Sequence, residues 1–550
     1  MYDSSLTHGQ TLSSWYADGT LAPGALHENR APWPSDECDV VIVGAGMAGL
    51  STAYHLLKRG RSVVVLEKGE IGSGETGRTT AHLASALDDR YYELEAMHGE
   101  HGAALAAASH AAAIDDIERI ATLENIACDF ARVPGYLFAQ DGSEERGQRE
   151  LLRELEAAQR AGLRVEAQPH APLDQVHGLC LRFENQAQFH PLRYLLGLAQ
   201  AVERLGGSIF TGTRVLGVAD TNQPHRVDVS DRPSLFARAV VVATNSPIND
   251  VVTMHTKLAP YRSYVIALGL PKGALPSALY WDTGDPYHYV RIAGDNDLLI
   301  VGGEDHKVAH AQRPEQRWQR LERWVRRHVP EAGAVQARWS GQILEPDDSL
   351  AFIGRNPGLR SNVFIATGDS GNGLTHGAIA GRLLSDLICE QDNPWAALYA
   401  PARKPRARSS LMQFVRENVD VAMCFTRSLA PALPRRHIPR GHGAIEQHGL
   451  RRLAVYVDEQ GQRHERSARC PHLGCSVKWN SAERSWDCPC HGSRFDPYGR
   501  VMTGPSPRDL QAVHVEPHEL PPLPNPEVGS RAACGAAPAA GINPRPGNAE

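Results

Sequence analysis

Near the N-terminus, a glycine-rich turn separates an apolar run from a segment with helical spacing. Val40–Val43 is uniformly apolar, as in a strand that is buried on both faces. It leads into Gly44-x-Gly46-x-x-Gly49, and residues 50–59 then carry apolar side chains on one helical face. Residues 62–66 are a second expected strand, followed directly by Glu67. A strand–turn–helix–strand unit with an acidic residue about twenty positions after the glycines predicts a dinucleotide site.

The chemistry of this unit follows from its geometry. The glycines let the backbone close on a pyrophosphate, whose charge lies at the helix N-terminus. The carboxylate of Glu67 can accept hydrogen bonds from a ribose diol. The alternative is a structural glycine turn that binds no ligand. The residues that we expect at the cofactor here are Gly44, Gly46, Met47, Ala48, Gly49 and Glu67.

The segment that follows, residues 68–82, is rich in Gly, Ser and Thr. It resembles the second flavin loop of the D-amino-acid oxidase/glycine oxidase superfamily. The resemblance implies FAD rather than NAD, with Lys68, Thr76, Arg78 and Thr79 at the cofactor. Some relatives attach the flavin covalently through a His, but Arg78 takes that place here, so we expect non-covalent FAD. His82 is the alternative attachment point; we expect it instead to open a helix.

Three later stretches resemble the same superfamily, so that the likeness spans residues 35–400. Val215 follows a helix and a glycine turn, and the resemblance implies that its backbone contacts the adenine. Residues 239–245 form a buried strand that ends at the cofactor with Ala243 and Thr244. Residues 363–377 form a strand, a glycine loop and a helix start, whose positive end would stabilise negative charge on reduced flavin. The implied contacts here are Gly368, Asp369, Asn372, Gly373, Leu374 and Thr375.

Between these stretches, no sequence motif identifies a catalytic residue. Tyr264, Tyr289 and Arg291 are weak candidates, because they lie where family members line the flavin and hold a substrate carboxylate. The alternative is that the aromatic side chains pack a sheet and Arg291 lies at the surface. Hydride transfer from a C–H bond beside nitrogen depends on alignment and does not strictly require a side-chain base.

Near the C-terminus, four of the ten cysteines and two histidines lie on two short Pro/Gly loops. The loops read Cys470-Pro-His472-Leu-Gly-Cys475 and Cys488-Pro-Cys490-His491-Gly-Ser493. Two thiolates and two imidazoles can hold zinc, or a [2Fe–2S] cluster on which two His replace two Cys. The loops resemble the Rieske family, closest to the cytochrome bc form that carries an extra disulfide. That resemblance implies a Rieske-type cluster with the ligands Cys470, His472, Cys488 and His491.

The same resemblance implies roles for the remaining loop residues. Cys475 and Cys490 would form the disulfide that ties the loops, and Ser493 would hydrogen-bond a cluster sulfur. High-potential family members carry a Tyr two residues after this Ser, whose hydroxyl donates to a ligand sulfur. This chain has Phe495 there, so we expect a potential below that of respiratory Rieske centres.

We expect a two-part fold. An α/β FAD-binding domain of the Rossmann-like, glutathione-reductase type carries an α+β substrate domain, and a small all-β Rieske domain follows. The predicted ranges are an N-terminal extension (1–34), the FAD-dependent oxidoreductase (35–400, with the substrate subdomain at about 135–190 and 255–335), a linker and helix (401–440), the Rieske domain (441–520) and a disordered tail (521–550). The basic stretch 399–408 is a solvated linker or, alternatively, a docking site for an acidic partner.

Composition excludes some partners. The chain of 550 residues has a net charge of −6, which gives no reason to expect nucleic acid or an anionic membrane. No apolar run reaches the length of a transmembrane helix, and the N-terminus has no secretory or twin-Arg signal. Because the other cysteines are scattered, we expect a cytoplasmic protein.

The two parts together suggest an electron-transfer enzyme. The leading hypothesis is an FAD-dependent dehydrogenase that oxidises a C–N bond of an amine or amino acid. Electrons would pass from the flavin to the cluster and on to an external acceptor, a protein or a quinone. The alternatives are an electron-transfer protein that serves a partner oxygenase or quinone, and a redox sensor without turnover. The whole chain resembles a bacterial group of fused flavin–Rieske oxidoreductases, whose flavin half is similar to gamma-glutamylputrescine oxidase.

Overall fold

A computed structural model describes most of the chain. The described residues are 9–17, 31–35, 37–140, 144–219, 224–248, 254–295, 297–310, 313–358, 362–404, 418–419, 421, 423, 437–448 and 451–513. The expected linker and helix (401–440) lie largely outside these residues, and the expected tail (521–550) lies entirely outside them.

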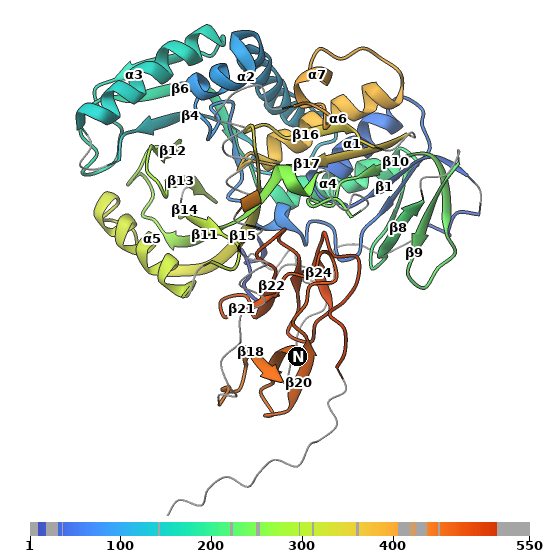
Figure 1. Cartoon of the computed structure of the whole chain (residues 1–550). Helices are drawn as coiled ribbons and strands as arrows, with labels where there is room; N and C mark the ends of the chain where they lie inside the picture. Colours follow the sequence, from blue (N-terminus) through green and yellow to red (C-terminus); the bar gives the residue numbers. More distant parts are fainter. Residues whose placement is uncertain are drawn as a thin grey trace, which may run out of the picture. The chain divides into compact units, whose positions relative to one another are not determined.

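The dinucleotide unit forms the centre of the first sheet (Figure 1). Its main strands are parallel, in the order β17, β10, β1, β2, β7. Strand β16 pairs with β17, and β9 pairs with β10 and β8, all antiparallel. The strands are β1 (Cys38–Val43), β2 (Val63–Leu66), β7 (Ser208–Phe210), β8 (Val215–Ala219), β9 (His225–Val229), β10 (Leu235–Val242), β16 (Phe352–Arg355) and β17 (Val363–Thr367).

Helices α1, α4, α6 and α7 pack on the strands of this sheet, whereas α3 packs on β5 and β6 of the second sheet. Helix α1 packs against α6 and α4, and α2 packs against α6 and α3. The helices are α1 (Met47–Leu57), α2 (Tyr91–Leu123), α3 (Glu144–Arg160), α4 (Pro191–Arg204), α6 (Gly373–Ile388) and α7 (Ala396–Tyr399), with short 3₁₀ turns η1 (Ser14–Tyr16), η2 (Glu75–Arg78) and η3 (His255–Lys257). Helix α2 is interrupted at Gly99, whose φ is 76°. The parallel central strands and the helices packed against them confirm the expected α/β FAD-binding fold.

A second, mixed sheet corresponds to the expected substrate part. Its order is β15-β11-β14-β13-β12-β4-β6-β3, with β5 beside β6, and α5 (Glu315–His328) packs on β11 and β14. The strands are β3 (His82–Leu83), β4 (Ala131–Phe138), β5 (Val165–Gln168), β6 (Cys180–Gln188), β11 (Leu258–Gly269), β12 (Leu279–Asp282), β13 (His288–Ala293), β14 (Leu298–Lys307) and β15 (Val335–Pro346). His82 therefore opens a strand rather than the expected helix, because it pairs with Gln188 at the sheet edge.

The C-terminal part is all β, as expected. It consists of a three-stranded sheet, β18-β19-β20, and a four-stranded sheet, β21-β22-β23-β24. The strands are β18 (His442–His448), β19 (Arg451–Val457), β20 (Arg463–Ser467), β21 (Lys478–Asn480), β22 (Ser485–Asp487), β23 (Arg494–Phe495) and β24 (Val501–Thr503). Its core contains the four loop cysteines together with Trp486 and Phe495. Among the described residues, no helix combines the length and apolarity needed to cross a membrane.

Candidate functional site

A cavity of about 310 Å³ lies where the first sheet meets the second. It is lined by residues from the β1–α1 turn, the loop after β2, the end of β10 and the start of α6. Of the cofactor residues expected from the sequence, it contacts Gly44, Gly46, Met47, Ala48, Glu67, Lys68, Thr76, Arg78, Thr79, Val215, Ala243, Thr244, Asp369, Asn372, Gly373 and Leu374. Gly49, Gly368 and Thr375 are not among the lining residues.

Gly49 has a packing role instead. A Cβ at Gly49 would lie 1.9 Å from the carbonyl oxygen of Gly44, so only glycine lets the helix start beneath the turn. Gly44 has a φ of +108°, and a Cβ there would lie 2.4 Å from the Ala243 carbonyl oxygen. Both glycines hold the N-terminus of α1 close to the end of the sheet, where a pyrophosphate would be bound.

Glu67 is held by two backbone amides. Ala45 N–H donates to its Oε2 at 2.8 Å, and Gly69 N–H donates to its Oε1 at 2.9 Å. These bonds fix the carboxylate at the cavity, and each oxygen keeps a lone pair for a ribose hydroxyl. Burial lowers the pKa of the neighbouring Lys68 to about 8. The donors, the acceptor and the helix end together fit the adenosine pyrophosphate half of FAD.

Asp369 also lines the cavity and lies just before α6. Its Oδ1 accepts a hydrogen bond from Leu344 N–H at 2.9 Å, and burial raises the pKa of its carboxyl to about 7. The first turn of α6 begins at Gly373, which also lines the cavity. A helix N-terminus directed at the cavity can stabilise negative charge on a bound flavin ring, so this side also fits FAD.

The substrate-facing lining differs from the weak sequence candidates. Tyr289 lines the cavity, and its hydroxyl lies 2.8 Å from the Ser263 hydroxyl. Tyr264 is buried in another core cluster, where its hydroxyl meets His306. Arg291 is buried as well, and its Nη1 donates to the backbone carbonyls of Thr80, Ala81 and Phe189. Tyr264 and Arg291 are not among the cavity-lining residues.

Further residues line the cavity besides the expected cofactor contacts. Asp88 lies beside Tyr287, whose hydroxyl donates to its carboxylate at 3.3 Å, and burial and Asp89 raise the pKa of Asp88 to about 6. Trp281 also lines the cavity. His82 lines it too, and burial lowers the pKa of that imidazole to about 3. Trp281 and Tyr287 belong to a run of aromatics at 280–289, and His82 ends the Gly/Ser/Thr-rich segment 68–82, whereas no motif in the sequence identifies Asp88.

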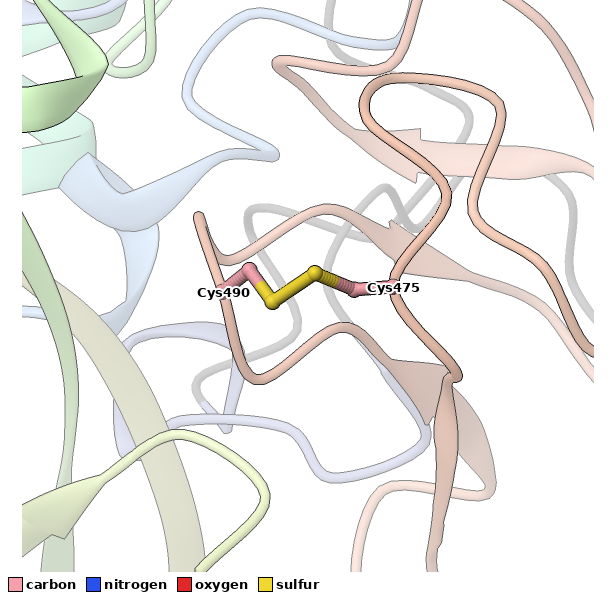
Figure 2. Close-up of a disulfide and its surroundings, with 2 residues drawn as sticks. All are labelled: Cys475 and Cys490. Atoms are coloured by element: carbon pink, nitrogen blue, oxygen red, sulfur yellow. A yellow bond between two sulfur atoms is a disulfide. The ribbon is translucent and has the colours of Figure 1, made fainter. Parts of the chain in front are cut away.

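The two Cys/His loops face each other and are joined by a disulfide between Cys475 and Cys490, as the Rieske resemblance implied (Figure 2). Backbone bonds close each loop: Gly474 N–H donates to Cys470 O at 2.9 Å, and Gly492 N–H donates to Cys488 O at 3.1 Å. The sulfur atoms of Cys475, Cys488 and Cys490 lie within 4.8 Å of one another. Because Cys475 and Cys490 form the disulfide, only Cys488 of these three has a free thiol that could bind a metal.

The remaining four loop side chains converge as a ligand set. The Cys470 and Cys488 thiols are buried and hydrogen-bonded to each other. The rings of His472 and His491 lie 5.0 Å apart, centroid to centroid. Burial and then His472 lower the pKa of His491 to about 4, a shift that favours the neutral imidazole through which His ligates metals. Two free thiols and two imidazoles on facing loops fit a Rieske [2Fe–2S] cluster.

Ser493 and Phe495 lie just after the second loop. The Ser493 hydroxyl accepts a bond from Ser506 N–H at 3.0 Å. The Ser493 hydroxyl also forms a hydrogen bond with the Cys470 thiol. Hydrogen bonds lower the pKa of this thiol: the largest effect comes from Cys488, and smaller ones come from the His472 amide and Ser493. The Phe495 side chain is fully buried and brings no donor to this site.

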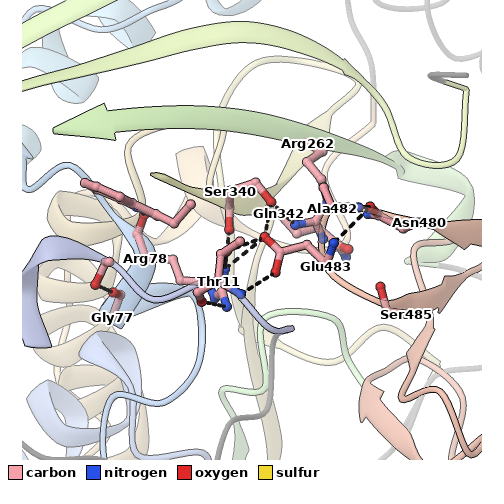
Figure 3. A network of polar contacts seen from close by, with 12 residues as sticks. Thr11, Gly77, Arg78, Arg262, Ser340, Gln342, Asn480, Ala482, Glu483 and Ser485 are labelled. Atoms are coloured by element: carbon pink, nitrogen blue, oxygen red, sulfur yellow. Dashed lines mark hydrogen bonds and ion pairs between the residues drawn. The ribbon is translucent and has the colours of Figure 1, made fainter. Parts of the chain in front are cut away.

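A turn between β21 and β22 inserts a carboxylate beside the flavin loop (Figure 3). Glu483, fully buried, accepts bonds from Arg78 Nη1 at 3.2 Å and from the Thr11 hydroxyl at 2.6 Å, and Ser340 also donates to it. Arg78 donates further to the Ser340 and Thr11 carbonyl oxygens. The side chain of Arg78 is therefore committed to this network.

The C-terminal domain also reaches the cavity itself. Residues 501–504 and 506–507 are among the residues that line it. The segment around Gly504 packs near Ile248 and Ser246. Arg214, next to Val215, donates to the Pro507 carbonyl oxygen at 2.7 Å. One cavity thus has lining residues from both parts of the chain.

Comparisons with known proteins agree with both halves of this site. The family profile of FAD-dependent oxidoreductases matches residues 39–387, and that of the Rieske [2Fe-2S] domain matches residues 430–514. A Rieske 2Fe-2S iron–sulfur protein of Bacillus subtilis, YhfW, is 31% identical over 485 residues, which are 87% of this chain and 94% of that protein.

Two further similarities concern the flavin part. Gamma-glutamylputrescine oxidoreductase of Escherichia coli is 27% identical over 370 residues, covering 64% of this chain and 83% of that protein. The crystal structure of glycine oxidase from Geobacillus kaustophilus has a TM-score of 0.58 at 19% identity, covering 67% of this chain and all of that one, which shows a shared fold. With FAD and a [2Fe–2S] cluster as its cofactors, the chain belongs to the family of FAD-dependent oxidoreductases and carries a C-terminal Rieske domain.

Proposed function

We propose that this enzyme is a dehydrogenase that oxidises a C–N bond of an amine or amino acid and delivers the electrons through the Rieske cluster to an external one-electron acceptor. FAD takes two electrons as a hydride, whereas the cluster carries one at a time. Per turnover, the substrate loses two electrons and two protons and becomes an imine, which water hydrolyses. Two acceptor molecules are each reduced by one electron, and the protons pass to solvent.

The single observation that carries the proposal is the shared cavity. The lining of the flavin site includes residues of the cluster domain, from β24 and the segment after it. The Glu483 network and the Gln342–Gly492 contact join the same two domains. A direct internal electron path requires such proximity, whereas an oxidase that reduces oxygen at its flavin has no use for it.

The lining of the substrate side favours an amine. Asp88 has a pKa of about 6, so its carboxylate is mostly ionised at neutral pH, and Tyr287 donates to it. Arg291, the candidate clamp for a substrate carboxylate, does not line the cavity, and its Nη1 donates to the backbone carbonyls of Thr80, Ala81 and Phe189. The names of the relatives point to C–N substrates as well: one is an oxidoreductase of gamma-glutamylputrescine, another an oxidase of glycine.

Anaerobic mixing with a panel of amines and amino acids tests this function. Flavin absorbance and the cluster's EPR signal would be followed on the same samples. We expect one substrate class to bleach the flavin, with a Rieske-type signal growing afterwards. In Cys470→Ser, the flavin should still bleach but no cluster signal should follow. If dithionite raises the cluster signal and no amine bleaches the flavin, substrate oxidation is refuted, and a partner-serving electron carrier or a redox sensor takes its place.

The proposal includes the cytoplasm as the place of the reaction and non-covalent binding of FAD. Cys38, Cys128, Cys180 and Cys389 are free thiols, which suits a reducing compartment. Denaturation followed by filtration should release the flavin from the protein; flavin that stays with the denatured chain would contradict non-covalent binding.

A further inference from the structure

Gln342 lies between the flavin cavity and the second cluster loop. It belongs to β15, is 1% exposed and lines the cavity. Its side-chain Nε2 donates to the Gly492 carbonyl oxygen at 3.1 Å, and its backbone N–H donates to Glu75 Oε2 at 2.8 Å. Its Oε1 is buried and has no hydrogen-bond partner among the described residues.

The contact with Gly492 depends on the absence of a side chain at that position, because the Gln342 side chain packs against it. Gly492 has a φ of +77°, and a Cβ there would lie 2.7 Å from Gln342 Nε2 and 2.8 Å from the Pro260 Cβ. The residue before it is His491, one of the four side chains assigned to the cluster. A single hydrogen bond therefore links a cavity-lining side chain to the peptide next to a cluster ligand.

The two ends of the Gln342 amide suit two different neighbours. Its donor end is used by the cluster loop, which leaves the acceptor end for an N–H group. Leaving a buried amide oxygen without a partner costs about 1–3 kcal/mol, so this atom calls for a donor, which bound water or a bound ligand can supply. A flavin ring carries N–H donors, whereas the neighbouring side chain of Glu75 is an acceptor when ionised.

We propose that Gln342 is a positioning residue that couples the flavin site to the cluster loop and sets the rate of electron transfer between them. The inference rests on the proposed function. The step moves one electron from reduced flavin to the oxidised cluster, and the proton that is released passes to solvent. Transfer slows steeply as the gap between two centres widens, so a bonded bridge that holds the loop against the cavity keeps it fast.

Another residue touches the cluster loops but does not share these properties. The ring of His255, in η3, lies 4.8 Å from the His472 ring and 5.9 Å from the His491 ring. His255 is not among the residues that line the flavin cavity. It packs on the ligand side of the loops, whereas Gln342 spans the loop and the cavity.

The test is flash photoreduction of the flavin in the anaerobic holoenzyme, with EDTA as electron donor, while the cluster is followed optically and by freeze-quench EPR. The variants are Gln342→Leu, which removes the amide at similar size, and Gln342→Glu, which replaces the donor to Gly492 with a repelling oxygen. Ser481→Ala is the matched control: it removes the 2.6 Å bond to Glu315, another contact between the two domains, at an exposed site.

In both Gln342 variants we expect the rate of cluster reduction to fall several-fold, because the cluster loop loses the bond that holds it against the cavity. FAD content, the cluster's potential and its dithionite-reduced EPR spectrum should match those of the wild type, which separates a lost bridge from a damaged cofactor site. Ser481→Ala should transfer at the wild-type rate.

Three other outcomes have definite meanings. If both Gln342 variants transfer electrons at the wild-type rate, the role of Gln342 is overturned and the proposed function still stands. If the wild-type cluster is not reduced by the photoreduced flavin, the internal path of the proposed function fails, and the role of Gln342 fails with it. If Gln342→Leu loses a cofactor, Gln342→Asn, which keeps the amide but cannot span the same gap, decides by the same rate measurement.

Discussion

At the scale of single residues, Phe495 distinguishes this cluster site. The side chain is fully buried, and it belongs to the core cluster that contains Cys470 and Cys488. Ser493 supplies a hydroxyl bond to the Cys470 sulfur, but position 495 supplies none. Hydrogen bonds to the sulfurs stabilise the more negative, reduced cluster, so their number sets its potential.

Phe495→Tyr should therefore raise the cluster's reduction potential. A hydrogen bond that favours the reduced form by about 1 kcal/mol corresponds to about 40 mV for a one-electron couple. The measurement is an EPR-monitored redox titration. Phe495→Leu, which alters packing without adding a donor, is the control and should titrate with the wild type. A Phe495→Tyr potential at or below the wild-type value would contradict the assignment of this position.

At the scale of elements, the β21–β22 turn connects the cluster domain to the flavin domain through one carboxylate. Arg78, Arg262 and Arg494 lower the pKa of Glu483, although burial opposes them. Burial and Arg494 in turn lower the pKa of Arg262, whose guanidinium is bonded to Ser340 Oγ at 2.8 Å. The carboxylate thus compensates several buried cations, so its removal leaves them unpaired.

Glu483→Gln should destabilise the folded protein by about 3–5 kcal/mol, as expected when one member of a buried ion network is removed. Differential scanning calorimetry would measure the loss. Glu459→Gln is the matched control, because Glu459 pairs with Arg484 at 2.8 Å but is 57% exposed. That change should cost about 0.5 kcal/mol or less. Equal effects of the two substitutions would show that the network does not hold the turn.

Helix α3 carries a buried acid that makes its packing on α2 sensitive to pH. Glu154 is 1% exposed and accepts a bond from Tyr92 N–H at 3.4 Å. Burial raises the pKa of this carboxyl from 4.5 to about 8. Because the folded-state pKa lies above the unfolded one, the folded protein holds the proton more tightly. The contribution of Glu154 to the free energy of unfolding is therefore fully present below about pH 4.5. It is lost progressively as the pH rises to about 8.

Glu154→Gln should remove this slope, because the amide stays neutral at every pH. We expect the variant to match the wild type near pH 5 and to exceed it by a few kcal/mol, in order of magnitude, at about pH 8. Melting temperatures across this range would test it. Glu156→Gln, at an exposed position of the same helix, should follow the wild-type curve. A constant difference between Glu154→Gln and wild type would contradict the pKa shift.

At the scale of the whole molecule, FAD should stabilise both parts of the chain, since residues of both line its cavity. At an FAD concentration about 100-fold above Kd, binding adds about 2.7 kcal/mol of stability. We expect removal of FAD to increase hydrogen exchange in β24, which lines the cavity. Strand β19, which contributes no lining residue, is the internal reference. Equal exchange in β24 with and without FAD would argue against a shared site.

Local sequence determined the elements that carry the cofactors. The glycines, Glu67 and the flanking strands lie within 30 residues, and each cluster loop holds its ligands within a few positions. In such short segments, spacing and backbone freedom dictate geometry, so the dinucleotide turn, the Cys/His loops and the two-part fold could be predicted. The resemblance to known families added the disulfide and the kind of cofactor.

Tertiary structure alone decided where the other side chains point. Arg78 turns to Glu483, 405 positions away, and Gln342 reaches Gly492, 150 positions away. Tyr264 and Arg291 carried the right chemistry for a flavin site, but neither lines the cavity, whereas Asp88, in the loop before α2, and Tyr287, just before β13, do. Such choices depend on how strands from distant segments pair and pack, which no local pattern encodes. The sequence therefore identified the cofactors, whereas only the tertiary structure showed the residue contacts between their two sites.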